Sequence, residues 1–110
     1  MLLKNEGGLL PLDRERVRSI AVVGPNADDA RNQLGDYTAH TVLQEVVTIL
    51  EGVRRAAPRA TVTHVRGCDV TAGGRDEIEK AAQAARAADI AVVVVGENEW
   101  QARRGDDKSY

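Results

Sequence analysis

Two glutamates and the chain's only tryptophan follow a run of apolar residues late in the sequence. Glu97, Glu99 and Trp100 come directly after the run at 90–95 and a single glycine. A carboxyl group that is partly removed from water beside an indole has a raised pKa, so it can act as a general acid near neutral pH. The indole could instead offer a flat surface to a sugar ring. Acidic loop residues are also common as plain solvated groups, so the catalytic and the solvated interpretation both stay open.

A second candidate loop follows the first apolar segment of the chain. The connection at 24–40 carries Asp36 and Tyr37. It is longer than most links between a strand and a helix, and links of that length are usually functional or mobile. Its first residues contain one glycine where a dinucleotide-binding turn needs three, and a proline that removes a backbone donor. We therefore expect a tight turn that ends a strand, and no phosphate site.

Other reactive residue types are sparse. Arg103 lies in a charged stretch that is usually solvated, although the arginine fork can also clamp hydroxyl or carboxylate groups. Cys68 is the only cysteine, which excludes an internal disulfide and predicts a buried structural thiol. His40 and His64 have no cysteine or histidine neighbour at metal-ligand spacing. We therefore expect no metal site and no cofactor.

The composition is typical of one small folded domain. The 110 residues are 43% hydrophobic and 29% charged, with a formal net charge of -2. Nucleic-acid binding needs lysines and arginines clustered on one face, so this balance argues against it. No segment approaches the roughly 20 apolar residues that cross a membrane. We expect neither a nucleic acid nor a membrane as a partner.

The apolar patterns predict strands and helices that alternate along the chain. Thr41 and Gln44 fit a capping box at the start of the first helix, because the threonine hydroxyl and the glutamine amide can serve each other's backbone N–H groups. Pro58 is expected to end that helix. The strands are expected at 19–23, 61–65 and 90–95, and the helices at 41–57 and roughly 75–88.

This alternation predicts an α/β fold with a mostly parallel sheet, because parallel strands need crossover connections. The third strand, which is the most apolar, is expected to be central and buried on both faces, and the more polar second strand to lie at an edge. These assignments favour the strand order 2-1-3, which right-handed crossovers turn into a three-layer α/β/α sandwich. We expect a linker at 1–18 and a partial sandwich domain at 19–110, truncated after its third strand.

Five short motifs along the chain are Leu2–Leu12, Ile20–Ala27, Gly35–Tyr37, Gly67–Asp69 and Val92–Glu97. In this order they resemble the second domain of family 3 glycoside hydrolases, the β-glucosidases and β-xylosidases. The resemblance covers nearly the whole chain. Each motif alone is modest, but five in order are specific.

The resemblance implies a retaining mechanism that uses two carboxyl groups on opposite sides of a β-glycosidic bond. The nucleophilic aspartate of such enzymes belongs to a preceding TIM barrel, which would be a partner of this chain beside the β-linked substrate. By position, Glu97 matches the loop that carries the acid/base glutamate, and Glu99 is the alternative. The resemblance further implies that the 110 residues alone are inactive. The sugar site would be lined by Asp36, Tyr37, Trp100 and Arg103.

A non-catalytic module of flavodoxin-like or receiver-like fold, used for binding or regulation, is the competing hypothesis. Receiver chemistry needs an acidic pair and a phosphoacceptor aspartate at strand ends. Asp28 and Asp29 lie several residues past the first strand, and the third strand ends in glycine and glutamate. Stabilisation by Mg²⁺ would favour this module, whereas quenching of Trp100 fluorescence by a sugar would favour the glycosidase.

Overall fold

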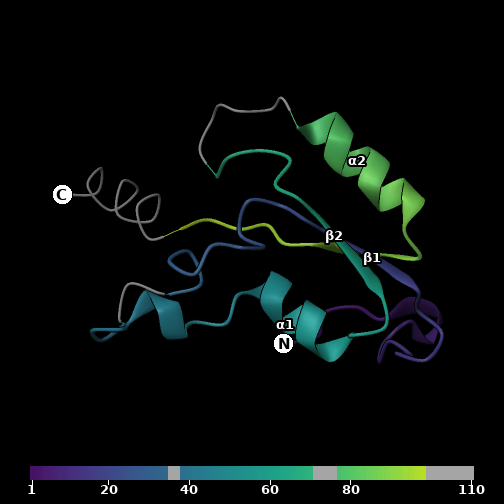
Figure 1. The fold of residues 1–110 in the computed structure, drawn as a ribbon, viewed down its shortest axis with the longest axis horizontal. Helices are drawn as coiled ribbons and strands as arrows, with labels where there is room; N and C mark the ends of the chain where they lie inside the picture. The colour runs from purple at the N-terminus through teal and green to yellow at the C-terminus, as the bar shows by residue number, and fades with distance from the viewer. Residues whose placement is uncertain (35–37, 71–76, 99–110) are drawn as a thin grey trace.

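A three-stranded parallel sheet lies between two helices (Figure 1). The computed structural model describes residues 1–34, 38–70 and 77–98. The described elements are β1 (Ser19–Val23), α1 (Ile49–Ala56), β2 (Thr61–Val65), α2 (Ile78–Ala87) and β3 (Ile90–Val93), with short 3₁₀ turns at Glu6–Gly8 and Leu43–Glu45.

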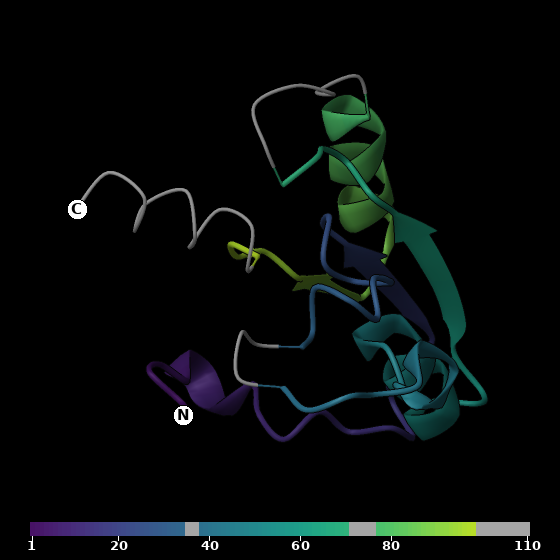
Figure 2. The same ribbon diagram turned by 90° about the vertical axis from the view of Figure 1, so that its left-hand side faces the viewer.

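The strand order β2-β1-β3 confirms the predicted arrangement 2-1-3. Ile20 of β1 is in register with Val62 of β2 and with Ile90 of β3, and all pairs run parallel. The two helices lie on opposite sides of this sheet (Figure 2). The fold is therefore the α/β sandwich fragment that the alternating pattern predicts.

The prediction that the third strand is central and buried on both faces is wrong. β1 is the central strand, and four of its five residues are buried. β3 ends at Val93, two residues earlier than expected, and the side chains of Val93 and Val95 are 62% and 69% exposed. Among the described residues β3 pairs with β1 alone, and α2 packs mainly over β1 and β2. One face of β3 consequently stays in contact with solvent.

The hydrophobic core lies between the sheet and α1. Ile20 and Val22 of β1 pack there against Leu50 of α1, which is 1% exposed. Because paired residues of parallel strands point to the same face, Val62 and Val92 join this core from the two outer strands. β1 thus pairs with a strand on each side and packs against α1, which fixes the position at which the following loop begins.

The first helix starts later than the capping-box pattern predicts. Its N-cap is Thr48, whose Oγ1 accepts a hydrogen bond from the Glu51 N–H at 3.2 Å. Thr41 lies outside the helix and donates its hydroxyl hydrogen to the Ala39 carbonyl at 2.9 Å. Both threonines precede a Glu or Gln by three residues, so the local pattern fits either one. Gln33 decides between them, because its side chain binds the backbone on both sides of Thr48.

The second helix is also shorter than expected. The sequence predicts a helix over roughly 75–88, whereas α2 spans Ile78–Ala87, and residues 75 and 76 lie outside the described part of the chain. Its small side chains allow the close approach to the sheet that alanine-rich helices favour. A Cβ added to Gly67, in the segment after β2, would lie 3.1 Å from the Ala81 Cβ.

A carboxylate joins β1 and β3 at the amino end of the sheet. The Oδ2 atom of Asp89 accepts hydrogen bonds from the backbone N–H groups of Arg18 and Ser19, both at 2.9 Å. The Ser19 hydroxyl oxygen accepts in return from the Asp89 N–H, also at 2.9 Å. These bonds, led by the one from Arg18, hold the pKa of Asp89 below its usual value.

Candidate functional site

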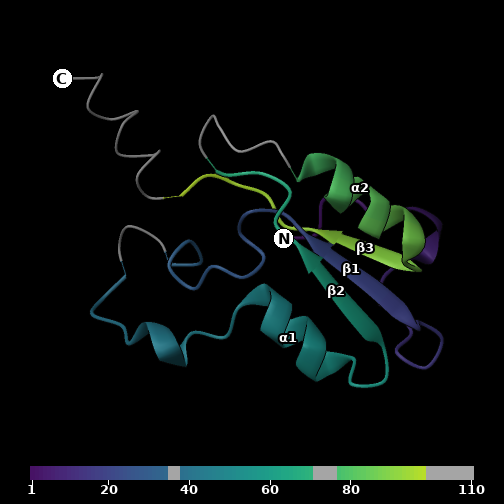
Figure 3. The same ribbon diagram turned by 45° about the horizontal axis from the view of Figure 1, so that its top comes forward.

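The loops that follow β1 and β3 leave the same end of the sheet, because the strands are parallel (Figure 3). In open α/β sheets ligands bind beyond this carboxyl end. The first loop begins at Gly24, and the second contains Gly96, Glu97 and Asn98. The geometry of these two segments therefore determines whether the candidate carboxylate, Glu97, is held at a defined position.

Gly24 lets the first loop pass directly against the end of β3. Its φ is +119°, and a Cβ added there would lie 2.1 Å from the Val94 carbonyl oxygen. The neighbouring backbone is paired on both sides. The Gly24 N–H donates to the Val65 carbonyl at 3.2 Å, and the Val94 N–H donates to the Val23 carbonyl at 2.7 Å. Glycine is needed here because a side chain has neither the space nor a favourable backbone conformation.

A chain of three asparagine side chains joins the two loops. The Asn26 Nδ2 donates to the Gly96 carbonyl at 3.0 Å, and the Asn32 Nδ2 donates to the Asn26 Oδ1 at 2.9 Å. The Asn98 Nδ2 donates in turn to the Asn32 Oδ1 at 3.4 Å. These hydrogen bonds connect the loop after β1 to both Gly96 and Asn98, so the residues on both sides of Glu97 are tied to that loop.

The amino end of α1 is occupied by acceptors from the protein itself. The Ile49 N–H donates to the Gln33 Oε1 at 2.7 Å, the Leu50 N–H to the Ala27 carbonyl at 2.8 Å, and the Glu51 N–H to Thr48. Phosphate groups bind helix amino ends through these same backbone donors. A turn that fills its own helix end in this way fits the predicted strand-ending role and does not favour a nucleotide site.

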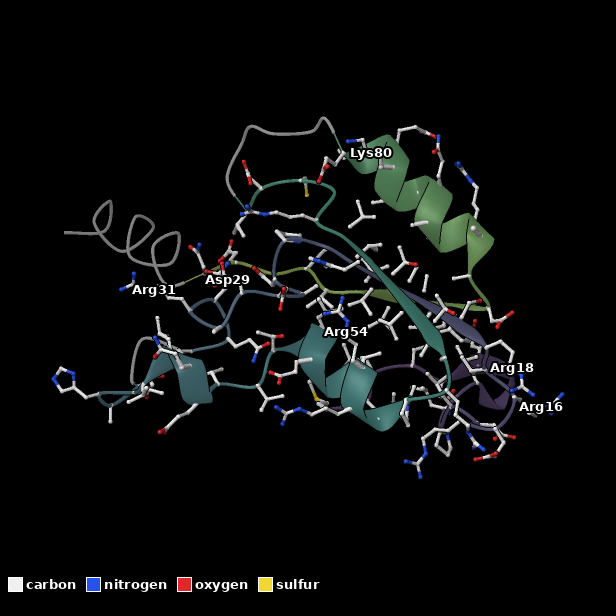
Figure 4. The ribbon with its side chains drawn as sticks, in the orientation of Figure 1. Arg16, Arg18, Asp29, Arg31, Arg54 and Lys80 are labelled. Carbon is white, nitrogen blue, oxygen red and sulfur yellow. The ribbon has the colours of Figure 1, made fainter. Side chains whose placement is uncertain are left out.

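Two acidic residues of the first loop are likewise engaged locally. The Asp28 Oδ1 accepts from the Thr48 hydroxyl at 2.8 Å. Asp29, labelled in Figure 4, accepts the Asn32 N–H at 2.9 Å. Both contacts order the loop itself. They give no specific support to the receiver-like hypothesis, in which such carboxylates would hold Mg²⁺.

Only one of the six predicted site residues lies in the described part of the chain. Glu97 is exposed in the loop after β3. The others fall outside the described residues, so their predicted roles stay predictions: Asp36, Tyr37, Glu99, Trp100 and Arg103.

Sequence reasoning missed the asparagines that order this edge of the sheet. Asn26 is 8% exposed and is the buried polar side chain of the described segments. Its position in a Gly-Pro-Asn turn after a buried strand is the one local signal for it. The two other members of the chain, Asn32 and Asn98, have no such signal, because their partners are set by the meeting of two loops.

The remaining candidates have no partner that suggests chemistry. Cys68 is only half-buried, so the prediction of a buried thiol is wrong in degree. The Nε2 atom of His64 is buried without a hydrogen-bond partner in the described structure. Within residues 1–34, 38–70 and 77–98, no three His, Cys, Asp or Glu side chains are grouped to hold a metal ion. Nor does any helix in these segments have the length and apolar character needed to cross a membrane.

The structure is an α/β sandwich with an acidic loop held at the carboxyl edge of its sheet, and comparison with known proteins assigns it to a family. The model of the glycosyl hydrolase family 3 C-terminal domain matches residues 1–110. The chain belongs to this family.

Individual relatives agree with this family. A β-xylosidase from Formosa agariphila is 31% identical over 99% of this chain, which covers 16% of that enzyme. A β-D-xylosidase from Arabidopsis thaliana is 36% identical, with 98% of the chain and 13% of the enzyme covered. A solved β-glucosidase structure from Erythrobacter marinus superposes with a TM-score of 0.72 at 32% identity, over 89% of this chain and 16% of that one. The chain therefore spans less than a fifth of each relative.

Proposed function

We propose that the chain is part of a retaining β-glycosidase and that it supplies the acid/base carboxylate from the loop after β3. The single observation that carries this proposal is that loop. In a family 3 C-terminal domain, an exposed Glu97 stands at the carboxyl edge of the sheet, tied on both sides to the loop after β1.

The proposed chemistry needs two carboxyl groups on opposite sides of the scissile bond. Glu97 protonates the leaving oxygen in the first step and removes a proton from water in the second. An aspartate on a preceding TIM barrel forms the covalent glycosyl intermediate, and in retaining enzymes the two carboxyl groups stand about 5–5.5 Å apart. Glu99 is the alternative acid/base residue, because it is two positions away in the same segment.

The sugar itself is bound by the two loops at this edge. The proposed contributors from the first loop are Asp36 and Tyr37, while Trp100 can offer a flat apolar surface and Arg103 can donate to hydroxyl groups through its fork. The relatives named β-xylosidase and β-glucosidase support a β-xyloside or β-glucoside as the substrate class. In this proposal residues 1–18 link the barrel to the sandwich domain.

The test uses aryl β-glycosides whose phenols differ in acidity, hydrolysed by the full-length protein. A glutamine at 97 keeps the shape of the side chain but cannot supply a proton. We expect Glu97→Gln to lower kcat/KM by about 10²- to 10⁴-fold for a poorly acidic phenol. A strongly acidic phenol such as 2,4-dinitrophenol leaves without protonation, so its glycoside should lose little.

Glu99→Gln is the matched control, because it is the same substitution in the same segment. A loss confined to poor leaving groups in Glu99→Gln alone would move the acid/base role to Glu99. Equal losses for all leaving groups, or none, in both variants would contradict the proposed function. Hydrolysis by the 110 residues alone that vanishes with Glu97→Gln would contradict the need for a barrel.

A further inference from the structure

The buried amide of Asn26 is placed to control where the acid/base loop lies. Asn26 follows β1, which is the most buried strand, and its side chain is itself 8% exposed. Its Nδ2 reaches the Gly96 carbonyl, which belongs to the same peptide unit as the Glu97 N–H. Fixing this peptide plane sets the direction in which the backbone enters Glu97.

We propose that Asn26 is a positioning residue, which holds the loop at 96–98 so that its acid/base carboxylate meets the leaving oxygen. This inference rests on the proposed function, but the role is distinct from it. As a positioning residue, Asn26 needs no contact with the substrate or the reacting atoms. It acts through the Gly96 carbonyl and, by way of Asn32, through the Asn98 side chain.

The Gly96 carbonyl, at the end of this series of asparagine amides, determines the direction of all three hydrogen bonds. A backbone carbonyl can only accept, so the Asn26 Nδ2 must face Gly96 and its Oδ1 must face Asn32. The Asn32 amide then donates to Asn26, and its own oxygen accepts from Asn98. An aspartate at 26 would place a charged acceptor against the Gly96 carbonyl. Only an amide of this length both donates and accepts here.

A neutral clamp also suits the chemistry of its neighbour. A charged group that held the same peptide would shift the pKa of a nearby carboxyl, down beside a cation and up beside another carboxylate. An acid/base group must change its protonation state twice in each turnover. The amides of Asn26 and Asn32 fix the loop without adding a charge to this environment.

A double-mutant cycle in the full-length protein tests the inference. In the wild-type background, we expect Asn26→Ala to lower kcat/KM for a glycoside of a poorly acidic phenol by about 10- to 100-fold, since a displacement of about 1 Å can cost that much. The kcat/KM for the 2,4-dinitrophenyl glycoside should change by less than threefold, because this phenol leaves without protonation. In the Glu97→Gln background, Asn26→Ala should cost less than twofold, because there is no proton donor left to position.

Asn5→Ala is the matched control for this cycle. Like Asn26, Asn5 donates its side-chain amide to a backbone carbonyl, that of Leu10, but it lies on the loop before β1 and accepts from the Leu10 N–H. Its substitution should leave the dependence of the rate on the leaving group unchanged. Asn32→Ala provides a milder second variant, which keeps the bond from Asn26 to Gly96 and should give a smaller loss of the same kind.

The outcomes separate this inference from the proposed function. If Asn26→Ala costs the same factor in both backgrounds, or the same factor for all leaving groups, then Asn26 supports only the fold and the positioning role is overturned. If Glu99→Gln carries the leaving-group effect, the cycle with Glu99 decides, and coupling supports the inference. If neither glutamate variant shows that effect, the proposed function fails first, and the positioning role falls with it.

Discussion

The two ends of the sheet fasten the same two strands in different ways. At the amino end, β1 and β3 are joined by the exposed carboxylate of Asp89, which accepts two backbone N–H groups. At the carboxyl end, they are joined by the buried neutral amide of Asn26. In both cases the partners lie about 70 residues apart in the sequence.

The kind of hydrogen bond at each end suits the groups that lie there. Charge-assisted hydrogen bonds are stronger than neutral ones, and the end without a candidate catalytic group uses them. The end that carries Glu97 uses amides, whose hydrogen bonds do not depend on pH over the range in which a glutamate titrates. The charged clamp and the candidate acid/base loop are thus kept at opposite ends of one short sheet.

The largest effect should come from filling the close contact at the carboxyl end. We expect Gly24→Ala to destabilise the protein by about 2–6 kcal/mol, because a positive φ and overpacking each cost about 1–3 kcal/mol. The new Cβ would meet the backbone of Val94, which cannot move without separating β3 from β1. Urea-induced unfolding, followed by circular dichroism, measures the loss.

Gly52→Ala is the control for that substitution. Gly52 lies inside α1, and no atom lies within 4 Å of a Cβ added there. The exchange should stabilise the protein by about 0.5–1 kcal/mol, because alanine loses less backbone entropy in a helix. A Gly24→Ala protein as stable as the wild type would show that the two loops do not touch as described.

A smaller effect should distinguish the charged clamp from the neutral one by its pH dependence. The folded protein holds the pKa of Asp89 below its ordinary value of 3.8, so this carboxylate contributes stability above that pH. The contribution is lost as the pH falls through the lowered value in the folded state. The difference in unfolding free energy between wild type and Asp89→Asn should therefore be constant near neutral pH and disappear in acid.

Asn26→Ala is the neutral counterpart in the same measurement. It should destabilise the protein by about 1 kcal/mol or more at every pH, because the amide does not titrate. Urea titrations of both variants between pH 2 and about pH 7 give the comparison, the range being set by the carboxyl pKa values of the two states. A pH-dependent cost for Asn26→Ala, or a constant one for Asp89→Asn, would contradict the contrast between the two ends.

The order of the elements could be predicted from the sequence, but the position and burial of each one could not all be predicted. The strands at 19–23 and 61–65 appear where the β-branched runs predict them, and the crossover rule gives the order 2-1-3. The apolar content of β3 led to the wrong position for this strand. Apolar content indicates how much surface a strand can bury, whereas the connections between the elements set the position of the strand in the sheet. β1 took the central place instead.

Contacts between distant segments explain what local patterns missed. The capping pattern fits Thr41 and Thr48 equally, and the side chain of Gln33 selects the second. Asn26 looks like an ordinary turn residue until the register of β1 and β3 brings Gly96 beside it. The candidate carboxylate could be inferred from its place after a strand, but the amides that hold it could not.

The acid/base role of Glu97 is tested most directly by the product formed with azide in Glu97→Ala. When the acid/base group of a retaining enzyme is removed, the glycosyl intermediate accumulates, and a small anion can attack it without a general base. With 2,4-dinitrophenyl β-glycoside and the full-length protein, we expect azide to restore turnover and yield the β-glycosyl azide. Absence of that product from Glu97→Ala, or its formation by Glu99→Ala alone, would contradict the assignment of Glu97.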